Sequence, residues 1–227
     1  MRQHLIIDAD DTLWENNIYF ERAFDEFVDF LAHSSMAAPD VRAVLDEIEA
    51  ANAKIHGYGS HSFGRNLRQC YERLAERAIA DRDLATVMGF AERILQQPME
   101  VIDGVRETLE YLSARHELTL FTKGHPDEQT LKIDRSDLRG FFAHTAVVRE
   151  KDVAAYTSLA ADRALLVEQS WMVGNSPKSD INPALAAGMN AVFVPHAHTW
   201  VLERQEIRPG RGRLLVIEQF RDLQKHF

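Results

Sequence analysis

The sequence predicts an α/β protein in which a doubly wound, mainly parallel β-sheet carries an inserted helical domain. Two observations lead to this prediction. Short apolar runs alternate with helical patterns at the start of the chain and again after about residue 98, an order typical of a parallel sheet with helices on both faces. Between residues 16 and 97 the chain instead has helical periodicity and no convincing strand.

The predicted strands are short apolar runs that each end in a polar or glycine-containing turn. They cover residues 5–7, 118–121, 146–148, 171–173 and 191–194. Continuous apolar runs of this kind are typical of strands that are buried on both faces. Helical patterns lie between them, for example at residues 105–112 and 184–187. In the tail, we expect an edge strand at residues 214–217 and a closing helix at residues 218–227.

Four apolar stripes at spacings of three and four residues predict the inserted helices. They fall within residues 20–31, 41–48, 63–74 and 84–94. An amphipathic helix buries its apolar face, so the aromatic and Met side chains of these stripes are predicted to be core. The sequence therefore predicts a core domain made of residues 1–15 and 98–227, and a helical domain made of residues 16–97.

The composition is that of an ordinary soluble globular protein. With 227 residues and 45% hydrophobic content, the chain can bury a sizeable core. Its formal net charge of −9 argues against a nucleic-acid or anionic-membrane partner, because either would require a basic surface. No apolar run approaches the ~20 residues of a membrane helix, and charged residues follow the start too closely for a signal peptide. We therefore expect a cytoplasmic protein.

The single cysteine, Cys70, excludes an intramolecular disulfide and a thiolate-rich metal site. It lies within the third apolar stripe of the predicted helical domain. We therefore expect a buried structural thiol at this position.

Three carboxylates stand together at the end of the first predicted strand, in the segment LIIDADDTLW. Asp8 and Asp10 are two residues apart, so at a strand tip they share one face while Ala9 points away. Carboxylates this close repel one another unless a cation or hydrogen-bond donors balance them, and a divalent metal would do so. One carboxylate could then attack or bind metal while the other moves a proton. The alternative interpretation is a polar turn in which Asp11 or Thr12 caps a helix.

Polar residues also follow other predicted strands, whose carboxyl ends meet at one edge of a parallel sheet. The second strand ends in Thr122 and Lys123, whose hydroxyl and backbone amides suit the oxygens of an anion. Lys151 follows the third strand and offers a compact positive charge for the same anion. Asn175 and Asp180 follow the fourth strand and carry oxygen atoms of the kind that Mg²⁺ accepts. Each is an ordinary loop residue by itself, but their order along the chain makes them a candidate site.

The chain resembles the haloacid dehalogenase-like (HAD) hydrolase superfamily. Residues 8–13, DADDTL, match its first motif, DxDx(T/V)L. Thr122, Lys151 and the segment GNSPKSD at residues 174–180 resemble the second, third and fourth motifs. The resemblance extends from the first strand to Val194. It implies a Rossmann-like core with a helical cap inserted between the first two motifs.

For the site, the resemblance implies a Mg²⁺-dependent phosphatase mechanism. Asp8 would attack phosphorus to form an aspartyl-phosphate, and Asp10 would protonate the leaving oxygen and then deprotonate water. Mg²⁺ would be held by the Asp8 carboxylate, the Asp10 backbone carbonyl and residues of the fourth motif. Thr122 and Lys151 would bind the transferring phosphoryl oxygens and stabilise the transition state.

Two positions depart from the family pattern. Asp11 stands where many relatives have glycine, and we interpret it as a cap. Asn175 stands where phosphatases of this type commonly carry a metal-binding aspartate. Its amide oxygen can coordinate Mg²⁺ but adds no charge. Asn175 and Asp180 are therefore both candidate metal ligands, and the sequence leaves open which of them is the direct one.

Substrate choice is expected to depend on the inserted domain and on residues near the second motif. The glycine-rich segment HGYGSHSFGR, residues 56–65, is predicted to be a loop that reaches the active site; a simple turn between helices is the alternative. The candidates for contact with a small phosphorylated metabolite are Tyr58, His61, Arg65 and Lys123. His196 and His198 follow the fifth strand and could approach the site, although such residues are more often loop surface. Either a monomer or a homodimer fits the sequence.

Three other functions stay open at this point. 2-Haloacid dehalogenases use the same aspartate nucleophile on carbon and need no metal. They generally lack an acid two residues after the nucleophile, so Asp10 favours phosphoryl chemistry, whereas the neutral Asn175 weakly favours a dehalogenase. Phosphomutases keep both aspartates, so the motif does not exclude them. A catalytically silent binding protein is less favoured, because all principal positions are occupied.

Overall fold

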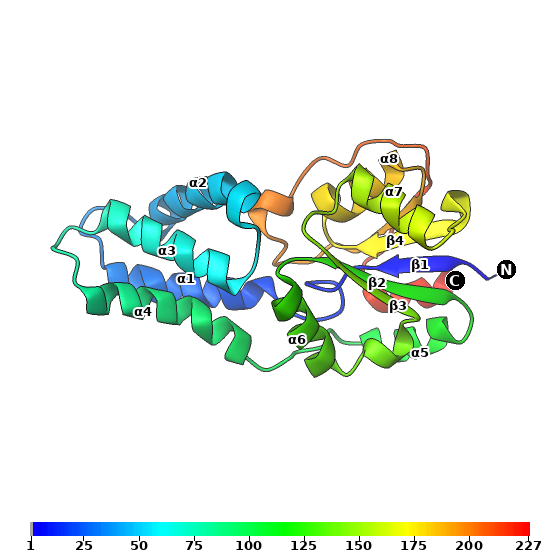
Figure 1. Ribbon diagram of the computed structural model, residues 1–227, viewed down its shortest axis with the longest axis horizontal. Helices are drawn as coiled ribbons and strands as arrows, with labels where there is room; N and C mark the ends of the chain where they lie inside the picture. The colour runs from blue at the N-terminus through cyan, green and yellow to red at the C-terminus, as the bar shows by residue number, and fades with distance from the viewer. Residues whose placement is uncertain (1) are drawn as a thin grey trace. The chain divides into compact units, whose positions relative to one another are not determined.

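A computed structural model describes residues 2–227, and the chain divides into two compact units (Figure 1). The core unit consists of the residues up to Glu15 together with Met99–Phe227. The helical unit is Asn16–Pro98. The second boundary lies one residue beyond the one that the sequence predicts.

A six-stranded parallel sheet forms the centre of the core unit. Its strands are β1 (His4–Ile7), β2 (Glu117–Lys123), β3 (His144–Val148), β4 (Ser170–Gly174), β5 (Asn190–Phe193) and β6 (Leu214–Val216). Their order across the sheet is β3-β2-β1-β4-β5-β6, so the strand order reverses at β1. All neighbouring strands are parallel, which confirms the predicted runs and the predicted edge strand. The residues after β1 therefore lie at the point where open α/β sheets bind ligands.

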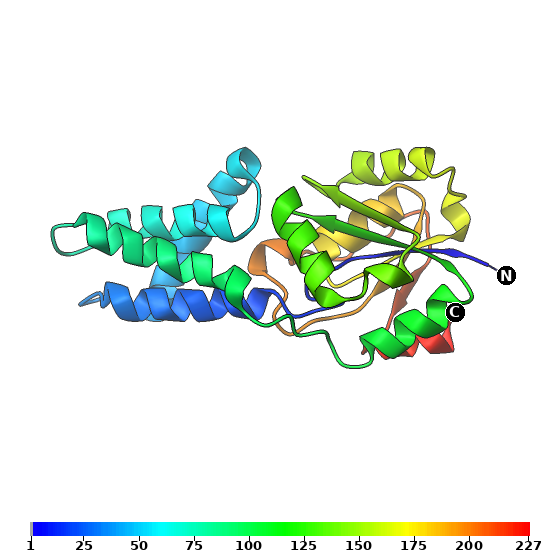
Figure 2. The ribbon, with the colours of Figure 1, turned by 60° about the horizontal axis from the view of Figure 1, so that its bottom comes forward.

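Helices cover both faces of the sheet (Figure 2). They are α5 (Val105–Ser113) and α6 (Pro126–Ser136) on one face, and α7 (Val153–Asp162) and α8 (Asn182–Ala186) on the other. The alternation of strand side chains produces this arrangement. Leu5 and Ile7 belong to one apolar cluster with Leu109 of α5, whereas Ile6 belongs to another with Tyr156 of α7. The core unit is thus the predicted doubly wound, Rossmann-like α/β fold.

The C-terminal segment differs from the prediction of a closing α-helix. It forms a 3₁₀ helix, η6 (Phe220–Lys225). Phe220 and Leu223 are its buried residues, and this spacing of three matches the three-residue repeat of a 3₁₀ helix. The remaining short segments are the 3₁₀ turns η2 (Arg139–Phe141), η3 (Val167–Gln169) and η5 (Val201–Glu203), and one π-helical turn, η4 (Pro177–Ile181).

The helical unit consists of the four predicted amphipathic helices and one short turn. These are α1 (Asn17–Leu31), α2 (Ala38–His56), α3 (Ser60–Leu74), α4 (Asp81–Glu92) and η1 (Arg93–Gln96). Phe27, Leu45 and Leu67 are fully buried in its centre. Cys70 is buried with them, as predicted, and burial raises the pKa of its thiol to about 12. In the described part of the chain, no helix is both long enough and apolar enough to cross a membrane.

The glycine-rich segment at residues 56–65 contains a short turn and the start of a helix, so the predicted ten-residue loop is wrong and the alternative, a turn between two helices, is correct. α2 extends to His56 and α3 starts at Ser60, which leaves only residues 57–59 between them. Gly57 and Gly59 have φ angles of 73° and 110°, which side chains rarely adopt, and they complete the turn within three residues. Beyond it, apolar residues at helical spacing extend α3 through the rest of the polar segment.

Candidate active site

The carboxyl edge of the core sheet collects the residues that the sequence singles out. Ile7, the last residue of β1, pairs with Leu120 of β2 and with Val173 of β4. The Asp8 amide continues the ladder by donating to the carbonyl of Val173 at 2.9 Å. Asp8 is therefore fixed by backbone geometry at the end of β1, between the loops that follow its two neighbours.

The centre of the site is a buried ion-pair group. Nζ of Lys151 lies 2.5 Å from Oδ1 of Asp8 and 2.5 Å from Oδ1 of Asp180. The side chain of Lys151 is only 2% exposed. The other oxygen of Asp180 accepts the backbone N–H of Ser176 at 2.9 Å, so the π-helical turn η4 holds this carboxylate in place. One ammonium is thus shared between two carboxylates.

The charges in this group are unbalanced. Burial and the neighbouring Asp180 raise the pKa of Asp8 to about 7, although Lys151 opposes the shift. Burial also raises the pKa of Asp180. Burial disfavours the charged form of Lys151, but the two carboxylates outweigh it, and its pKa is raised. Two carboxylates and one ammonium leave a net negative charge, which a bound cation would compensate.

Asn175 lies beside Asp8, and the two share a hydroxyl neighbour. Oγ1 of Thr12 is 3.1 Å from Oδ2 of Asp8 and 3.3 Å from Oδ1 of Asn175. The Asn175 amide nitrogen donates to Oγ1 of Thr199 at 3.1 Å, which fixes the direction of its oxygen. Asp180 is held by Lys151 and by the Ser176 amide, whereas an oxygen of Asp8 and the oxygen of Asn175 both lie next to the Thr12 hydroxyl, so we take Asp8 and Asn175 as the candidate pair for a metal. An all-oxygen donor set fits Mg²⁺.

Asp10 has surroundings quite different from those of Asp8. Nζ of Lys132 lies 2.7 Å from each of its carboxylate oxygens. Gln129 donates to Oδ2 at 2.9 Å and the Trp14 indole donates to Oδ1 at 2.8 Å. Burial opposes ionisation, but Lys132 and these hydrogen bonds outweigh it and lower the pKa of Asp10. In this state Asp10 is an acceptor and has no proton to donate.

Sequence reasoning missed Gln129 and Lys132. Both lie on α6, three residues apart and therefore on one face of the helix. The signal was present: α6 begins at Pro126, four residues after Thr122 of the second motif, so its first turns must lie near the site. Thr122 itself is buried, and its hydroxyl lies 3.5 Å from Oε1 of Gln129.

Lys123 is engaged with protein groups, in contrast to its predicted substrate contact. Its Nζ lies 2.6 Å from Oε1 of Glu203 and 2.9 Å from Oγ of Ser179. Burial would raise the pKa of Glu203, but Lys123 and the other donors lower it. Glu203 also accepts a hydrogen bond from Ser176 at 2.6 Å. Lys123 thus connects the second-motif loop to the fourth-motif loop.

The other predicted substrate contacts belong to the helical unit. Tyr58 lies half-buried in the turn before α3, while His61 and Arg65 are exposed on that helix. Their part in substrate binding stays a prediction.

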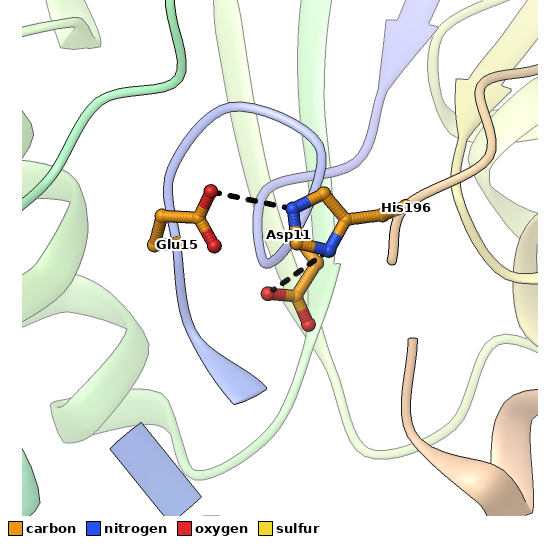
Figure 3. A group of neighbouring side chains, drawn as sticks. All are labelled: Asp11, Glu15 and His196. Carbon is orange, nitrogen blue, oxygen red and sulfur yellow. Dashed lines mark hydrogen bonds and ion pairs between the residues drawn. The ribbon is translucent and has the colours of Figure 1, made fainter. Parts of the chain in front are cut away.

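Asp11 is not a helix cap, because α1 begins only at Asn17. It has a φ of 57° and turns its carboxylate to His196, whose Nδ1 lies 3.8 Å from Oδ1 of Asp11 (Figure 3). Nε2 of the same ring lies 3.3 Å from Oε1 of Glu15. His196 is therefore no ordinary surface residue, because it connects the loop after β5 to two positions of the loop after β1.

The comparisons identify the family. A model of the haloacid dehalogenase-like hydrolases matches residues 56–194, more than half of the chain. This range includes Thr122, Lys151 and Asn175, and Asp8 precedes it. The chain belongs to the haloacid dehalogenase-like hydrolase family and is a hydrolase.

The chain is also similar to solved structures over almost its whole length. A haloacid dehalogenase-like family hydrolase from Xanthomonas campestris is 28% identical, with a TM-score of 0.80, covering 99% of this chain and 94% of that one. A 2-haloacid dehalogenase from Pseudomonas syringae pv. Tomato DC3000 is 19% identical, with a TM-score of 0.63 and coverage of 99% and 97%. A predicted phosphoglycolate phosphatase from Haemophilus somnus 129PT is 16% identical, with a TM-score of 0.69 and coverage of 99% and 97%. No curated protein matches the chain. The fold alone does not choose between phosphatase and dehalogenase.

Proposed function

We propose that this protein is a Mg²⁺-dependent phosphatase that hydrolyses a small phosphomonoester through an aspartyl-phosphate on Asp8. The observation that supports this most is the contrast between two carboxylates at one strand tip. Asp8 contacts Lys151, and its pKa is raised, whereas Asp10 contacts Lys132, and its pKa is lowered. Carboxylates with such different surroundings are suited to different roles in one reaction.

In the first step an oxygen of Asp8 attacks phosphorus. The new bond joins carboxylate oxygen to phosphorus, and the bond to the leaving oxygen breaks with its electron pair on that oxygen. Lys151 is the cation closest to the nucleophile and would stabilise the charge on the phosphoryl oxygens. The buried Thr122 hydroxyl would bind another of these oxygens.

In the second step water attacks the aspartyl-phosphate and Asp8 leaves as a carboxylate. The water proton needs an acceptor, and Asp10, an ionised carboxylate in the resting site, is suited to this base role. Its lowered pKa gives no support to the acid role that the sequence assigns to it in the first step.

Mg²⁺ fits the donor set of this site. The Asp8 carboxylate, the Asp10 backbone carbonyl and the Asn175 amide oxygen would hold it, and Asp180 would keep Lys151 in position. When bound, the ion supplies positive charge that neutralises the phosphate and lets an anionic nucleophile approach.

A 2-haloacid dehalogenase is the second candidate, and the neutral Asn175 favours it. Lys151 already provides Asp8 with a cation at 2.5 Å, so a nucleophile that attacks carbon would not require a metal. The oxygen of Asp8 would then bond to carbon, and halide would leave with the electron pair. Water would then hydrolyse this ester, giving its proton to a base and restoring the Asp8 carboxylate. We rank this reaction below the phosphatase because 2-haloacid dehalogenases generally lack an acid two residues after the nucleophile, where this chain has Asp10.

A substrate panel separates these functions. Purified protein is incubated with phosphomonoesters and with 2-haloacids, with Mg²⁺ or with a chelator, and phosphate and halide are measured. We expect phosphate release that requires Mg²⁺ and is lost in Asp8→Asn. Halide release without metal, together with no phosphate release, would overturn the proposal in favour of the dehalogenase.

A further inference from the structure

The carboxylate of Asp10 is surrounded by donors from two segments of the core unit. Trp14 approaches Oδ1 from the loop after β1, at 2.8 Å. Gln129 of α6 approaches Oδ2 at 2.9 Å. Lys132, one turn further along α6, lies 2.7 Å from both oxygens. Two carboxylate oxygens offer about four lone-pair positions, and these four contacts use them all.

The loop after β2 leads directly into α6, whose side chains Gln129 and Lys132 contact the Asp10 carboxylate. Gly124 has a φ of 148°, which side chains rarely adopt, and a Cβ there would lie 2.7 Å from Nε2 of Gln129. Only glycine therefore lets Gln129 reach past the loop to Asp10. Pro126 then occupies the start of α6, where its fixed φ suits the first helical turn.

Lys132 is buried, and its side chain is only 10% exposed. Burying an ammonium costs free energy unless a carboxylate compensates it, so the position of Lys132 is tied to that of Asp10. Because this ammonium spans both oxygens, it can shift to one of them and release a lone pair on the other. Asp10 can then accept a proton while its carbon and its remaining oxygen stay in place.

We propose that Lys132 is a positioning residue for the second half of the reaction. It holds Asp10 where that carboxylate takes the proton of the attacking water. In this step the water oxygen bonds to phosphorus, the bond from phosphorus to Asp8 breaks with its electron pair on Asp8, and the water proton passes to Asp10. This inference rests on the proposed phosphatase function.

Loss of the positioning role of Lys132 should change kcat and KM in a way that general damage to the site does not. kcat/KM reports the steps up to formation of the aspartyl-phosphate, while kcat also includes its hydrolysis. Slowing the hydrolysis alone lowers kcat and KM together, leaves kcat/KM nearly unchanged and makes the phosphorylated enzyme accumulate. Damage to the nucleophile or to phosphate binding lowers kcat/KM.

The test compares Lys132→Met with Lys132→Arg and with Arg135→Met, which removes an exposed cation from the same helix. p-Nitrophenyl phosphate with Mg²⁺ is the substrate, because its leaving group departs without an acid. We expect Lys132→Met to lower kcat and KM by about 10- to 100-fold each, with phosphorylated enzyme trapped by acid quench. Lys132→Arg should restore kcat to within about threefold, since a guanidinium also spans two carboxylate oxygens. Arg135→Met should stay within about twofold of the wild type.

A fall in kcat/KM equal to the fall in kcat, or unchanged kinetics, would overturn the proposal. If Lys132→Met does not fold, Lys132→Gln is measured in its place with the same expectations. If the wild type releases no phosphate, the proposed function fails. Crystal structures of Lys132→Met and Arg135→Met then test separately whether Lys132 positions the Asp10 carboxylate. The Asp10 carboxylate should leave its place beside Gln129 and Trp14 only in Lys132→Met; an unmoved carboxylate would overturn the inference.

Discussion

Lys151 and Asp8 form an ion pair of 2.5 Å at the carboxyl edge of the core sheet, and both side chains are almost completely buried. The same ammonium contacts Asp180 at 2.5 Å, so one cation is shared between two carboxylates. The nucleophile therefore keeps a cationic partner before any metal or substrate binds. The stability of the site therefore depends on the charge of each of these three side chains.

Lys151→Met should destabilise the protein strongly at neutral pH. It leaves Asp8 and Asp180 buried without their cation, and breaking a buried ion pair costs about 3–5 kcal/mol. The free energy of unfolding, measured in urea without metal, should fall by this amount. Lys225→Met is the control: its ammonium is exposed and pairs only with Asp222 in the contacts of the described residues, so a loss below about 1 kcal/mol is expected.

The same variant should be less destabilised in acid. Both unpaired carboxylates have raised pKa values, so they take up protons on moderate acidification and lose the charge that makes their burial costly. The difference in unfolding free energy between Lys151→Met and the wild type should be smaller at about pH 5 than at about pH 8. An equal difference at both pH values would mean that the loss is one of packing.

Mg²⁺ binding should weaken as the pH falls through neutrality. Burial and Asp180 raise the pKa of Asp8 in the metal-free protein to about 7, so below that value a proton must leave before the carboxylate can bind metal. The Kd from calorimetric titration should rise by up to about tenfold per pH unit below neutrality and level off above about pH 8. Asp8→Asn should bind weakly at every pH. A wild-type Kd that does not change across this range would contradict the role of Asp8 as ligand.

Asn175→Asp should tighten Mg²⁺ binding. The substitution keeps the oxygen beside Thr12 and adds a negative charge, and ligand charge is a main determinant of affinity for hard cations. We expect a decrease in Kd of about tenfold or more. Asp180→Asn is the matched comparison, because it acts on the other candidate ligand. If Asp180→Asn weakened binding and Asn175→Asp changed nothing, Asp180 would be the direct ligand.

Gly174→Ala should damage the site although the backbone at this position is ordinary. A Cβ there would overlap the carboxylate of Asp180, which would have to move away from Lys151. Overpacking of this kind costs about 1–3 kcal/mol, and activity should fall with it. Gly140→Ala is the control, because nothing lies within 4 Å of its added Cβ. Wild-type activity in Gly174→Ala would show that the position of Asp180 is unimportant.

The sheet could be predicted from the sequence because its signals are local. A run such as residues 5–7 is apolar over its whole length, and Asp8 follows it directly. Both the strand and its polar end could therefore be predicted. The helical unit had equally local signals in its apolar stripes. The loop at residues 56–65 was predicted wrongly because its glycine and polar residues outweighed the third apolar stripe, which already begins at Phe63, inside the predicted loop.

The partners of the site residues could not be predicted, because they depend on packing between distant segments. Lys132 and Asp10 are 122 residues apart in the chain, and no spacing rule connects them. Asp11 was interpreted as a cap from its place after a strand, whereas the backbone turns it toward His196. Lys123 was predicted to contact substrate because it lies beside the second motif, whereas its ammonium pairs with Glu203, 80 residues further along the chain.

The central claim is that Asp8 carries the phosphoryl group. The most direct measurement is an acid quench of the enzyme during turnover of a phosphomonoester with Mg²⁺, followed by peptide mapping by mass spectrometry. We expect phosphate on the peptide that contains Asp8, at the Asp8 carboxylate, and none in Asp8→Asn or when Mg²⁺ is chelated. A phosphorylated residue elsewhere, or turnover with no phosphorylated peptide and undiminished activity in Asp8→Asn, would contradict it.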